Sequence, residues 1–369
     1  MMNKLRVLHR WVGLVLVLPM VLQGISGLII AAAPPFNEAT RPLAKSDAPQ
    51  RDFSEIVDAA RKAGAADQVP ARLRMSGGER QVAIIDMAKP PQRMATARIF
   101  IDPGSLEILE VVQNPDDVVR FAHRLHETLL IAGPLGHSII GWFGIGLLFI
   151  AVTGIPLWWP RQGRVKAAFI VSPTATGYRF QRELHGAAGI WLLAILLLQS
   201  LSGASMAFPE TARAIVGLSG PQPRGGGMKL DAAAFDVDEA ARQAEQAAPQ
   251  AHIRDIRLPL APGQPAAITL LPDGSAARAP TALVRLDASG HRVLGVEDPR
   301  TAAFGVPLLG WMRALHSGGG LGPVWTLVIC IAGLALPLSA VTGFTMWLLR
   351  RRNLRLREKK RQEILQAAE

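Results

Sequence analysis

Residues 184–203, LHGAAGIWLLAILLLQSLSG, nearly repeat residues 8–27, LHRWVGLVLVLPMVLQGISG. In both stretches a Leu-His pair opens an apolar run, and a glycine, a glutamine and a Ser-Gly pair follow at the same distances from the histidine. These residues are Gly13, Gln23 and Ser26-Gly27 in the first stretch, and Gly189, Gln199 and Ser202-Gly203 in the second. The equal spacing of these residues predicts that the chain arose by a tandem duplication.

A second pair of segments repeats as well. Residues 124–160 contain RLHETLL and then AVTGIPLWWP, and residues 313–350 contain RALHSGG and then AVTGFTMWLLR. The spacing from histidine to threonine is 27 residues in the first segment (His126 to Thr153) and 26 in the second (His316 to Thr342). Each copy therefore consists of an apolar run, a long insert and a second apolar run.

The apolar residues gather in four runs, 11–31, 137–159, 186–208 and 322–349, which contain no Asp, Glu, Lys or Arg. About 20 residues of helix cross the hydrocarbon layer of a bilayer, so each run predicts a membrane helix. We expect an α-helical membrane protein with four transmembrane helices from a tandem duplication and two small α+β outer domains. The expected helices are 1–33, 136–160, 184–208 and 321–349; the outer domains are 34–135 and 209–320; a loop covers 161–183 and a basic tail 350–369.

The net charge of +11 could suggest a nucleic-acid-binding protein, but its distribution does not. Residues 1–10, 160–184 and 350–369 hold 16 of the 40 Lys and Arg and only 4 of the 29 acidic residues. Basic residues at the ends of membrane helices mark the cytoplasmic side. We therefore expect no nucleic-acid partner, a multi-pass protein in contact with membrane lipid, and both termini in the cytoplasm.

The two inserts show the same order of elements. In the first, FSEIVDAARKA predicts an amphipathic helix, and three strand-like segments follow, the last of which forms a hairpin around Pro103-Gly104. In the second, FDVDEAARQAEQA precedes the same succession, and Phe53 and Asp102 correspond to Phe235 and Asp287. Residues 221–229, rich in Pro and Gly, predict a linker.

This doubled arrangement, with LHRWVG, LHETLL, AVTGIPLWWP and LHGAAGIW at the membrane boundaries, resembles the PepSY-associated transmembrane family. That family includes iron-regulated inner-membrane proteins and ferric-siderophore reductases. The resemblance implies PepSY-like outer domains on the periplasmic side of a bacterial inner membrane, and a membrane haem protein.

Both copies enter the membrane from the same side, so their pseudo-two-fold axis runs along the membrane normal. Equivalent residues then lie at equal depth. His9 and His185 would meet at the cytoplasmic face, and His126 and His316 at the outer face.

Two imidazoles that face each other across a helical bundle can ligate one haem iron. The single cysteine, Cys330, excludes a CxxCH attachment motif, so the haem would be b-type. We therefore predict two haem b groups, with His9, His185, His126 and His316 as ligands of the iron. The alternative for any one of these histidines is a polar anchor at the membrane interface.

Several other residues are candidates for cofactor contacts. Gln23 and Gln199 would orient the outer imidazoles or simply bond neighbouring helices. His123, Arg124 and Arg313 would lie near haem propionates or substrate, with a lipid headgroup as the alternative for the arginines. The three remaining histidines are expected to be ordinary polar residues: His137, His252 and His291.

The resemblance and the histidines together predict a haem-dependent ferric-siderophore reductase that passes electrons outward, with His126 and His316 as the catalytic pair. The sequence has no dinucleotide-binding motif, so the electron donor would be a separate cytoplasmic or membrane protein. The alternative is a non-redox PepSY module that regulates a partner or assists siderophore or iron transport. A permease is less favoured because the four runs carry no charge.

Overall fold

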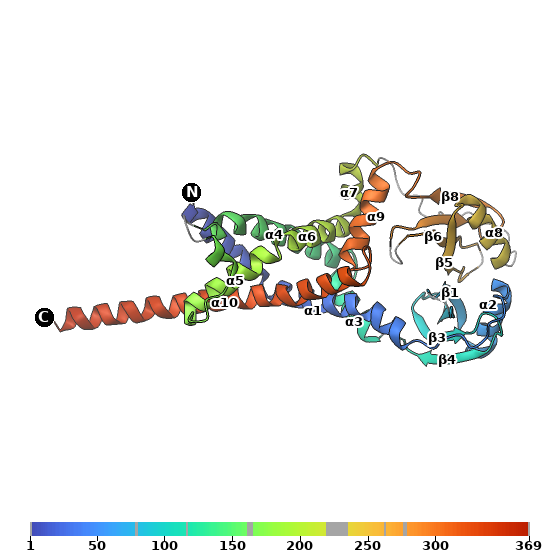
Figure 1. The fold of residues 1–369 in the computed structure, drawn as a ribbon, viewed down its shortest axis with the longest axis horizontal. Coiled ribbons are helices and arrows are strands. Elements are labelled where there is room, and N and C mark those ends of the chain that lie inside the picture. Colours follow the sequence, from blue (N-terminus) through green and yellow to red (C-terminus); the bar gives the residue numbers. More distant parts are fainter. Residues whose placement is uncertain are drawn as a thin grey trace.

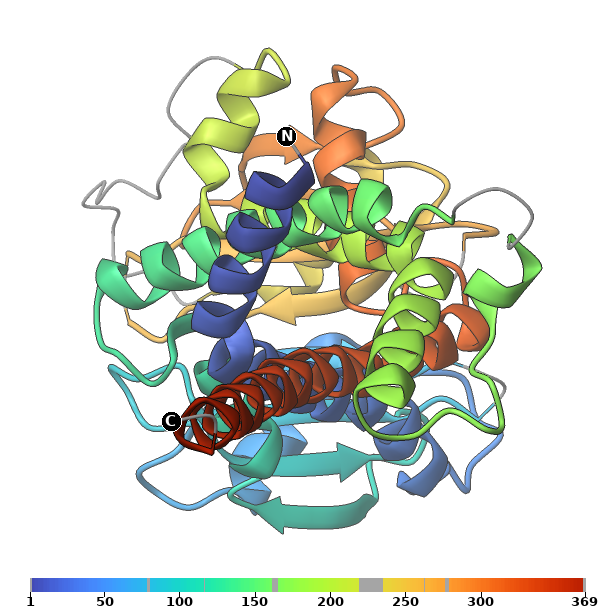
Figure 2. The same cartoon turned by 90° about the vertical axis from the view of Figure 1, so that its left-hand side faces the viewer.

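A bundle of long helices and a β-sheet with two short helices make up the molecule (Figure 1). The computed structural model describes residues 2–77, 80–115, 117–160, 165–218, 235–261, 263–275 and 279–367. We call the end of the bundle next to the sheet the sheet-side end, and the opposite end the far end. Figure 2 looks along the bundle from the far end, where both termini lie.

Three helices among the described residues are long and apolar enough to cross a membrane: α1 (Met2–Thr40), α4 (Pro134–Trp158) and α10 (Pro323–Gln366). A fourth crossing would be made by α5 (Gly177–Trp191) and α6 (Leu193–Ala207), two helices that meet at an angle of 66°. The chain is therefore a membrane protein with three spans, or four if the bent pair counts as one.

The bend differs from the single straight helix that we expected over residues 184–208. It lies at Leu192, whose ψ of 0° departs from helical values. Hydrogen bonding continues through the bend, because Leu192 N–H bonds to the carbonyl of Ala188 and Leu196 N–H to that of Leu192. The uncharged run 186–208 continues through Leu192 without a break, so it gave no sign of the bend.

Two other helix ends also differ from the expectation. Helix α1 was expected to end at residue 33 but continues through Pro34 and Pro35 to Thr40. Its last turns are largely exposed, so water can satisfy the carbonyls that lose a donor to proline. Helix α10 continues through the basic tail to Gln366.

The bundle is held most closely where α1 crosses α10. A Cβ atom added at Gly24 would lie 2.5 Å from Cδ of Pro337 and 2.6 Å from the carbonyl oxygen of Gly333, so only glycine fits there. Small residues at such crossings let helix backbones approach closely in membranes. Around the crossing lies an apolar core of Leu16, Met20, Ile150, Leu336 and Ala340.

The sheet has eight antiparallel strands in the order β4-β3-β2-β1-β5-β6-β7-β8. The strands are β1 (Val69–Met75), β2 (Ala83–Ala88), β3 (Ala95–Ile101), β4 (Ile108–Gln113), β5 (Ala251–Arg257), β6 (Ala266–Pro272), β7 (Ala282–Leu286) and β8 (Val293–Glu297). Each insert supplies four strands, and β1 pairs with β5 at the seam. The two expected α+β domains thus share one sheet.

Helices α2 (Phe53–Ala63) and α8 (Val237–Ala247) cover one face of the sheet. Strand residues alternate between the two faces, so Leu73, Ile85, Ile99 and Ile256 point into the core under these helices, with no exposed surface. The expected linker, 221–229, lies outside the described residues.

Two short helices connect the sheet to the bundle. Helix α3 (Asp117–Thr128) leads from β4 to α4, and α9 (Gly305–His316) leads from β8 to α10. On the same side α7 (Pro209–Ile215) follows α6, and at the far end the 3₁₀ helix η1 (Lys166–Phe169) precedes α5. Helices α3 and α9 carry His126 and His316 in their last turns.

Candidate functional site

His126 lies against α1 at the sheet-side end of the bundle. Its Nδ1 is 3.0 Å from Ser26 Oγ, and that hydroxyl is 2.6 Å from the carbonyl oxygen of Leu22. A hydroxyl has one proton, which Ser26 donates to Leu22, so Ser26 Oγ accepts a hydrogen bond from His126 Nδ1–H. The carbonyl of Gln23 is a further acceptor for His126. Nδ1 therefore carries the proton, and Nε2 keeps its lone pair.

His316 repeats this arrangement on α6. Its Nδ1 is 2.9 Å from Ser202 Oγ, which donates to the carbonyl oxygen of Leu198 at 2.6 Å. Because Ser202 donates its one proton to Leu198, Nδ1 of His316 carries the proton of the imidazole, and Nε2 is free to bind a metal.

The far end of the bundle uses threonine in place of serine. His9 Nδ1 is 2.9 Å from Thr153 Oγ1, and His185 Nδ1 is 3.0 Å from Thr342 Oγ1. Each threonine donates its proton to a carbonyl of its own helix, Phe149 or Leu338, at 2.8 Å. All four histidines thus have the same tautomer, fixed by a hydroxyl on another helix.

A glycine follows each of these hydroxyl residues, and the imidazole lies over it. A Cβ atom added at Gly27 or Gly203 would come within 3.1 Å of the Cε1 of His126 or His316. At Gly343 and Gly154 the corresponding distances to the Cε1 of His185 and His9 are 3.4 and 3.7 Å. We call each histidine with its Ser-Gly or Thr-Gly pair a histidine clamp. The four clamps use Ser26-Gly27, Ser202-Gly203, Thr153-Gly154 and Thr342-Gly343.

The clamps bring histidines from the two repeats together. The imidazole centroids of His126 and His316 are 6.2 Å apart, and the ring planes make an angle of 63°. Two imidazoles that bind one metal ion from opposite sides through nitrogens at about 2 Å have centroids roughly 6 Å apart. The spacing of the sheet-side pair therefore fits two axial ligands of a single iron. At the far end, His9 lies within electrostatic range of His185.

The sheet-side histidines are neutral at physiological pH. Burial, followed by the nearby His123, lowers the pKa of His126 to about 4. Burial, followed by the nearby His126, lowers the pKa of His316 to about 4. Neutral imidazole is the form that binds a metal.

Gln23 and Gln199 lie beside the sheet-side pair, but neither side-chain amide forms a hydrogen bond to an imidazole. Gln199 Nε2 donates to the backbone carbonyl of His316 at 3.2 Å. Gln199 Oε1 and Gln23 Nε2 are buried and have no hydrogen-bond partner among the described residues. An unsatisfied buried polar atom costs about 1–3 kcal/mol, so these two atoms are available to a bound group.

The other candidate residues lie at the surface near the sheet-side pair. His123 Nδ1 is 3.5 Å from Glu127 Oε1, and this contact raises the pKa of His123. Arg124 and Arg313 are exposed; Arg313 precedes His316 by three residues and shares its helix face, whereas Arg124 is only two residues from His126.

The three histidines expected to be ordinary polar residues make local contacts. His137 Nδ1 is 3.0 Å from the carbonyl oxygen of Glu127, His252 Nδ1 is 3.0 Å from Asp273 Oδ1, and His291 Nδ1 is 3.2 Å from the carbonyl oxygen of Ser289. Within the described ranges, no three His, Cys, Asp or Glu side chains form a group able to hold a metal ion. A haem iron needs only two axial ligands from the protein, and the histidines occur in pairs.

The serines of the sheet-side clamps were missed as functional residues by the sequence argument, which noted only that Ser-Gly recurs. A signal was present, because a hydroxyl residue followed by glycine occurs once near the outer end of each copy's first run and once near the end of its second. The sequence did not show which histidine lies against each Ser-Gly or Thr-Gly pair.

The fold and the clamps together define a membrane protein with paired histidines in its bundle and an antiparallel sheet at one end. The chain belongs to the family described as the PepSY-associated TM region, whose model matches residues 6–350. The expected resemblance is thereby confirmed over nearly the whole chain. No curated protein matches the sequence.

Proposed function

We propose that this protein binds two haem b groups and passes electrons across a bacterial inner membrane to a ferric siderophore. His126 and His316 would hold one haem, and His9 and His185 would hold the other. The observation that supports this assignment best is the fourfold clamp, since each hydroxyl holds the proton on Nδ1 and leaves Nε2 as the donor atom. Hydrogen bonds of this kind orient metal-binding histidines and increase their basicity.

The residues of the chain would hold and orient the haem groups. A bound haem supplies reversible one-electron transfer between Fe(III) and Fe(II). The hydroxyls fix the ring tautomers, and the glycines allow the rings to lie against the neighbouring helix. Gln23 and Gln199 offer unpaired polar atoms beside the sheet-side pair. The apolar core around Leu16 and Leu336 keeps water away from the path between the two pairs.

The direction of transfer follows from charge. The described parts of the basic segments 1–10, 160–184 and 350–369 lie at the far end, which we assign to the cytoplasm by the positive-inside rule. The sheet would then lie in the periplasm. His9 and His185 would hold the haem nearer a separate donor, and His126 and His316 would hold the haem nearer the sheet and the substrate.

The proposed substrate is a ferric siderophore bound beside the sheet-side pair. Hard oxygen ligands hold Fe(III) far more strongly than Fe(II), so adding one electron to the iron weakens the chelate and releases Fe(II). His123, Arg124 and Arg313 surround the exit on α3 and α9 and would contact haem propionates or substrate.

The experiment is a single-turnover assay on the purified full-length protein. The protein is reduced chemically, freed of reductant and mixed with a ferric siderophore and a ferrous-iron trap. We expect reoxidation of the haem bands together with Fe(II) formation, and loss of both in the His126→Ala variant. Reduced protein that stays reduced in the presence of the chelate, or a His126→Ala protein with full activity, would contradict the proposal and favour the non-redox alternative.

A further inference from the structure

The face of the sheet opposite α2 and α8 is rich in arginine around the seam between the two repeats, and beside this group it carries an apolar cluster that includes Ile84 and Phe100. In Figure 1 the two helices lie at the outer end of the molecule, so this second face is turned toward the bundle. Strand alternation places on it the neighbours of the core residues Leu73, Ile85, Ile99 and Ile256. These neighbours form what we call the arginine cluster, namely Arg72, Arg74, Arg98 and Arg257 with Asp86 and Asp255.

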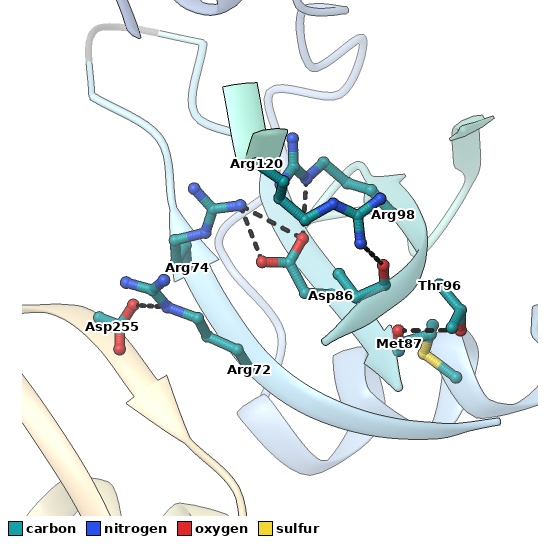
Figure 3. Close-up of polar contacts among 9 residues, drawn as sticks. Arg72, Arg74, Asp86, Met87, Thr96, Arg98, Arg120 and Asp255 are labelled. Carbon is teal, nitrogen blue, oxygen red and sulfur yellow. Dashed lines mark hydrogen bonds and ion pairs between the residues drawn. The ribbon is translucent and has the colours of Figure 1, made fainter. Parts of the chain in front are cut away.

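Two aspartates lie among the four arginines of this cluster, and Figure 3 shows both of them with Arg72, Arg74 and Arg98. Asp86 pairs with Arg98 Nε at 2.7 Å and with Arg74 Nη2 at 3.0 Å. Asp255 pairs with Arg72, and its Oδ1 is 3.9 Å from Arg257 Nε, which is too far for a hydrogen bond. The described members of the cluster, four arginines and two aspartates, therefore carry a net positive charge, although Arg98 has a further interaction besides that with Asp86.

The pairing of the strands brings two of these positive charges face to face at the seam between the two repeats. Arg72 of β1 lies directly opposite Arg257 of β5. Like charges at directly opposed positions of an antiparallel pair destabilise the sheet. Among the described residues, Asp255 is the carboxylate within ion-pair distance of both arginines.

Arg74 also has too few negatively charged or accepting groups around it. Its Nε is buried and has no hydrogen-bond partner within the part of the chain that the structure describes. Burial lowers the pKa of Arg74; Asp86 opposes this effect, and Arg98 and Arg72 add to it. A negatively charged group placed here would satisfy the free N–H and reduce the repulsion between the guanidinium groups.

Helix α3 connects this cluster to the sheet-side histidine pair. Arg120, in the first turns of α3, donates from Nη1 to the carbonyl oxygen of Ala95 at 2.9 Å, at the start of β3, the strand that carries Arg98. Figure 3 shows Arg120 beside Arg98. His126 follows Arg120 by six residues on the same helix, roughly 9 Å along its axis. The cluster thus lies on the side of the sheet from which an electron would arrive.

We propose that the arginine cluster is an anion-binding site and that the ferric chelate it selects is negatively charged, with catecholate or carboxylate oxygens at its periphery. Guanidinium groups bind such oxygens through paired, charge-assisted hydrogen bonds. The chelate as ligand rests on the proposed function, but binding at the cluster requires neither haem nor electrons. A trihydroxamate chelate, which is not an anion, would gain nothing from the cluster.

The test is equilibrium binding to the full-length protein in detergent, with the ferric complex of a tricatecholate and that of a trihydroxamate as probes. We expect the tricatecholate complex to bind more tightly, with an affinity that falls as salt rises. Arg74→Gln and Arg257→Gln should each weaken it roughly tenfold and leave trihydroxamate binding unchanged. Arg257 is largely exposed, so its replacement keeps the fold intact. Arg61→Gln, on an exposed position of α2 beyond the sheet, is the matched control.

Equal binding of both complexes by the wild type, or unchanged tricatecholate binding in both variants, would overturn the proposal. So would competition by glycerophosphate without tricatecholate binding, since the site would then hold a lipid headgroup or free phosphate. The two proposals fail in different ways. A protein that takes up no haem yet binds the anionic complex through Arg74 would remove the electron-transfer function alone, whereas a haem-containing reductase without charge preference would remove only this inference.

Discussion

The two repeats of the bundle differ in shape but hold their histidines identically. In the first repeat α1 is one continuous helix from Met2 to Thr40, whereas the corresponding segment of the second is divided into α5 and α6 with a bend of 66°. Ser26 and Ser202 nevertheless meet His126 and His316 at 3.0 and 2.9 Å. The two repeats thus differ in the course of their first membrane segment but share the geometry of the sheet-side clamps.

The largest expected effect comes from removing a histidine. If His126 and His316 hold one haem together, His126→Ala and His316→Ala should each remove that haem and leave about half of the haem that the wild type binds. A pyridine haemochrome assay on purified protein measures this directly. His137→Ala is the control, since that side chain is exposed and bonds only to the carbonyl of Glu127. Unequal losses from the two variants would break the equivalence of the repeats.

The clamp hydroxyls should have the next largest effect. Ser26→Ala and Ser202→Ala remove the hydroxyl that accepts from Nδ1–H and leave a backbone carbonyl, that of Gln23 or Gln199, as the remaining acceptor, so the ring is held less firmly. Loss of such an orienting partner typically lowers metal affinity about 10–100-fold, and we expect the same loss in both repeats. Haem titration into the apoprotein gives the affinity. Ser138→Ala, which removes a hydroxyl that bonds only within α4, should bind haem normally.

The clamp glycines should show smaller effects, and these should distinguish the two ends of the bundle. An added methyl group would press on the imidazole at Gly27 and Gly203, where the nearest atom is 3.1 Å away, and barely touch it at Gly154, where the distance is 3.7 Å. Alanine at the first two positions should therefore weaken haem binding, and alanine at Gly154 should not. Gly189→Ala, with nothing within 4 Å, is the control. Equal effects at Gly27 and Gly154 would argue against the clamp geometry.

The smallest expected effect compares the two halves of the sheet. Burial opposes ionisation of Asp102, but backbone N–H groups of Ser46, Ser105, Lys45 and Gly104 outweigh it and lower the pKa. Burial likewise opposes ionisation of Asp287, and the Ser289 hydroxyl and nearby backbone N–H groups outweigh it. Because both pKa values are lowered, the stabilisation is present above the ordinary pKa near 4 and is lost as pH falls through the lowered value.

Asp102→Asn and Asp287→Asn should therefore loosen their turns by about 1–3 kcal/mol each at neutral pH and have little effect in strong acid. Hydrogen exchange of the amides of Gly104 and Gly290, which bond to these carboxylates, reports the change. Asp47→Asn, at an exposed position, is the control. Unchanged exchange at neutral pH would refute the role of the carboxylates.

Local patterns predicted local structure well. The amphipathic segment FSEIVDAARKA forms α2 with the expected bounds, and the alternation of AAITLLP is that of β6. The apolar runs gave three clear spans because hydropathy and length suffice to recognise a membrane helix. The pairing of His126 with His316 was expected from symmetry alone, and their imidazole centroids lie 6.2 Å apart.

Contacts between distant segments could not be predicted in the same way. The pairing of β1 with β5 joins Arg72 to Arg257 across 185 residues, and nothing in either strand specifies its partner. The roles of Ser26 and Ser202 depend on which helix face meets α3 or α9, which is decided by packing. The bend at Leu192 lies within the uncharged run 186–208, and the absence of charge says nothing about the direction of the backbone.

A visible spectrum of the purified full-length protein, oxidised and then reduced, with the haem counted per chain, tests the central claim most directly. The four clamps predict two haems per chain, both six-coordinate and low-spin with two imidazole ligands. A protein that stays colourless after expression with ample haem, or one whose haem content is unaffected by the loss of His126 and His9 together, would contradict the account.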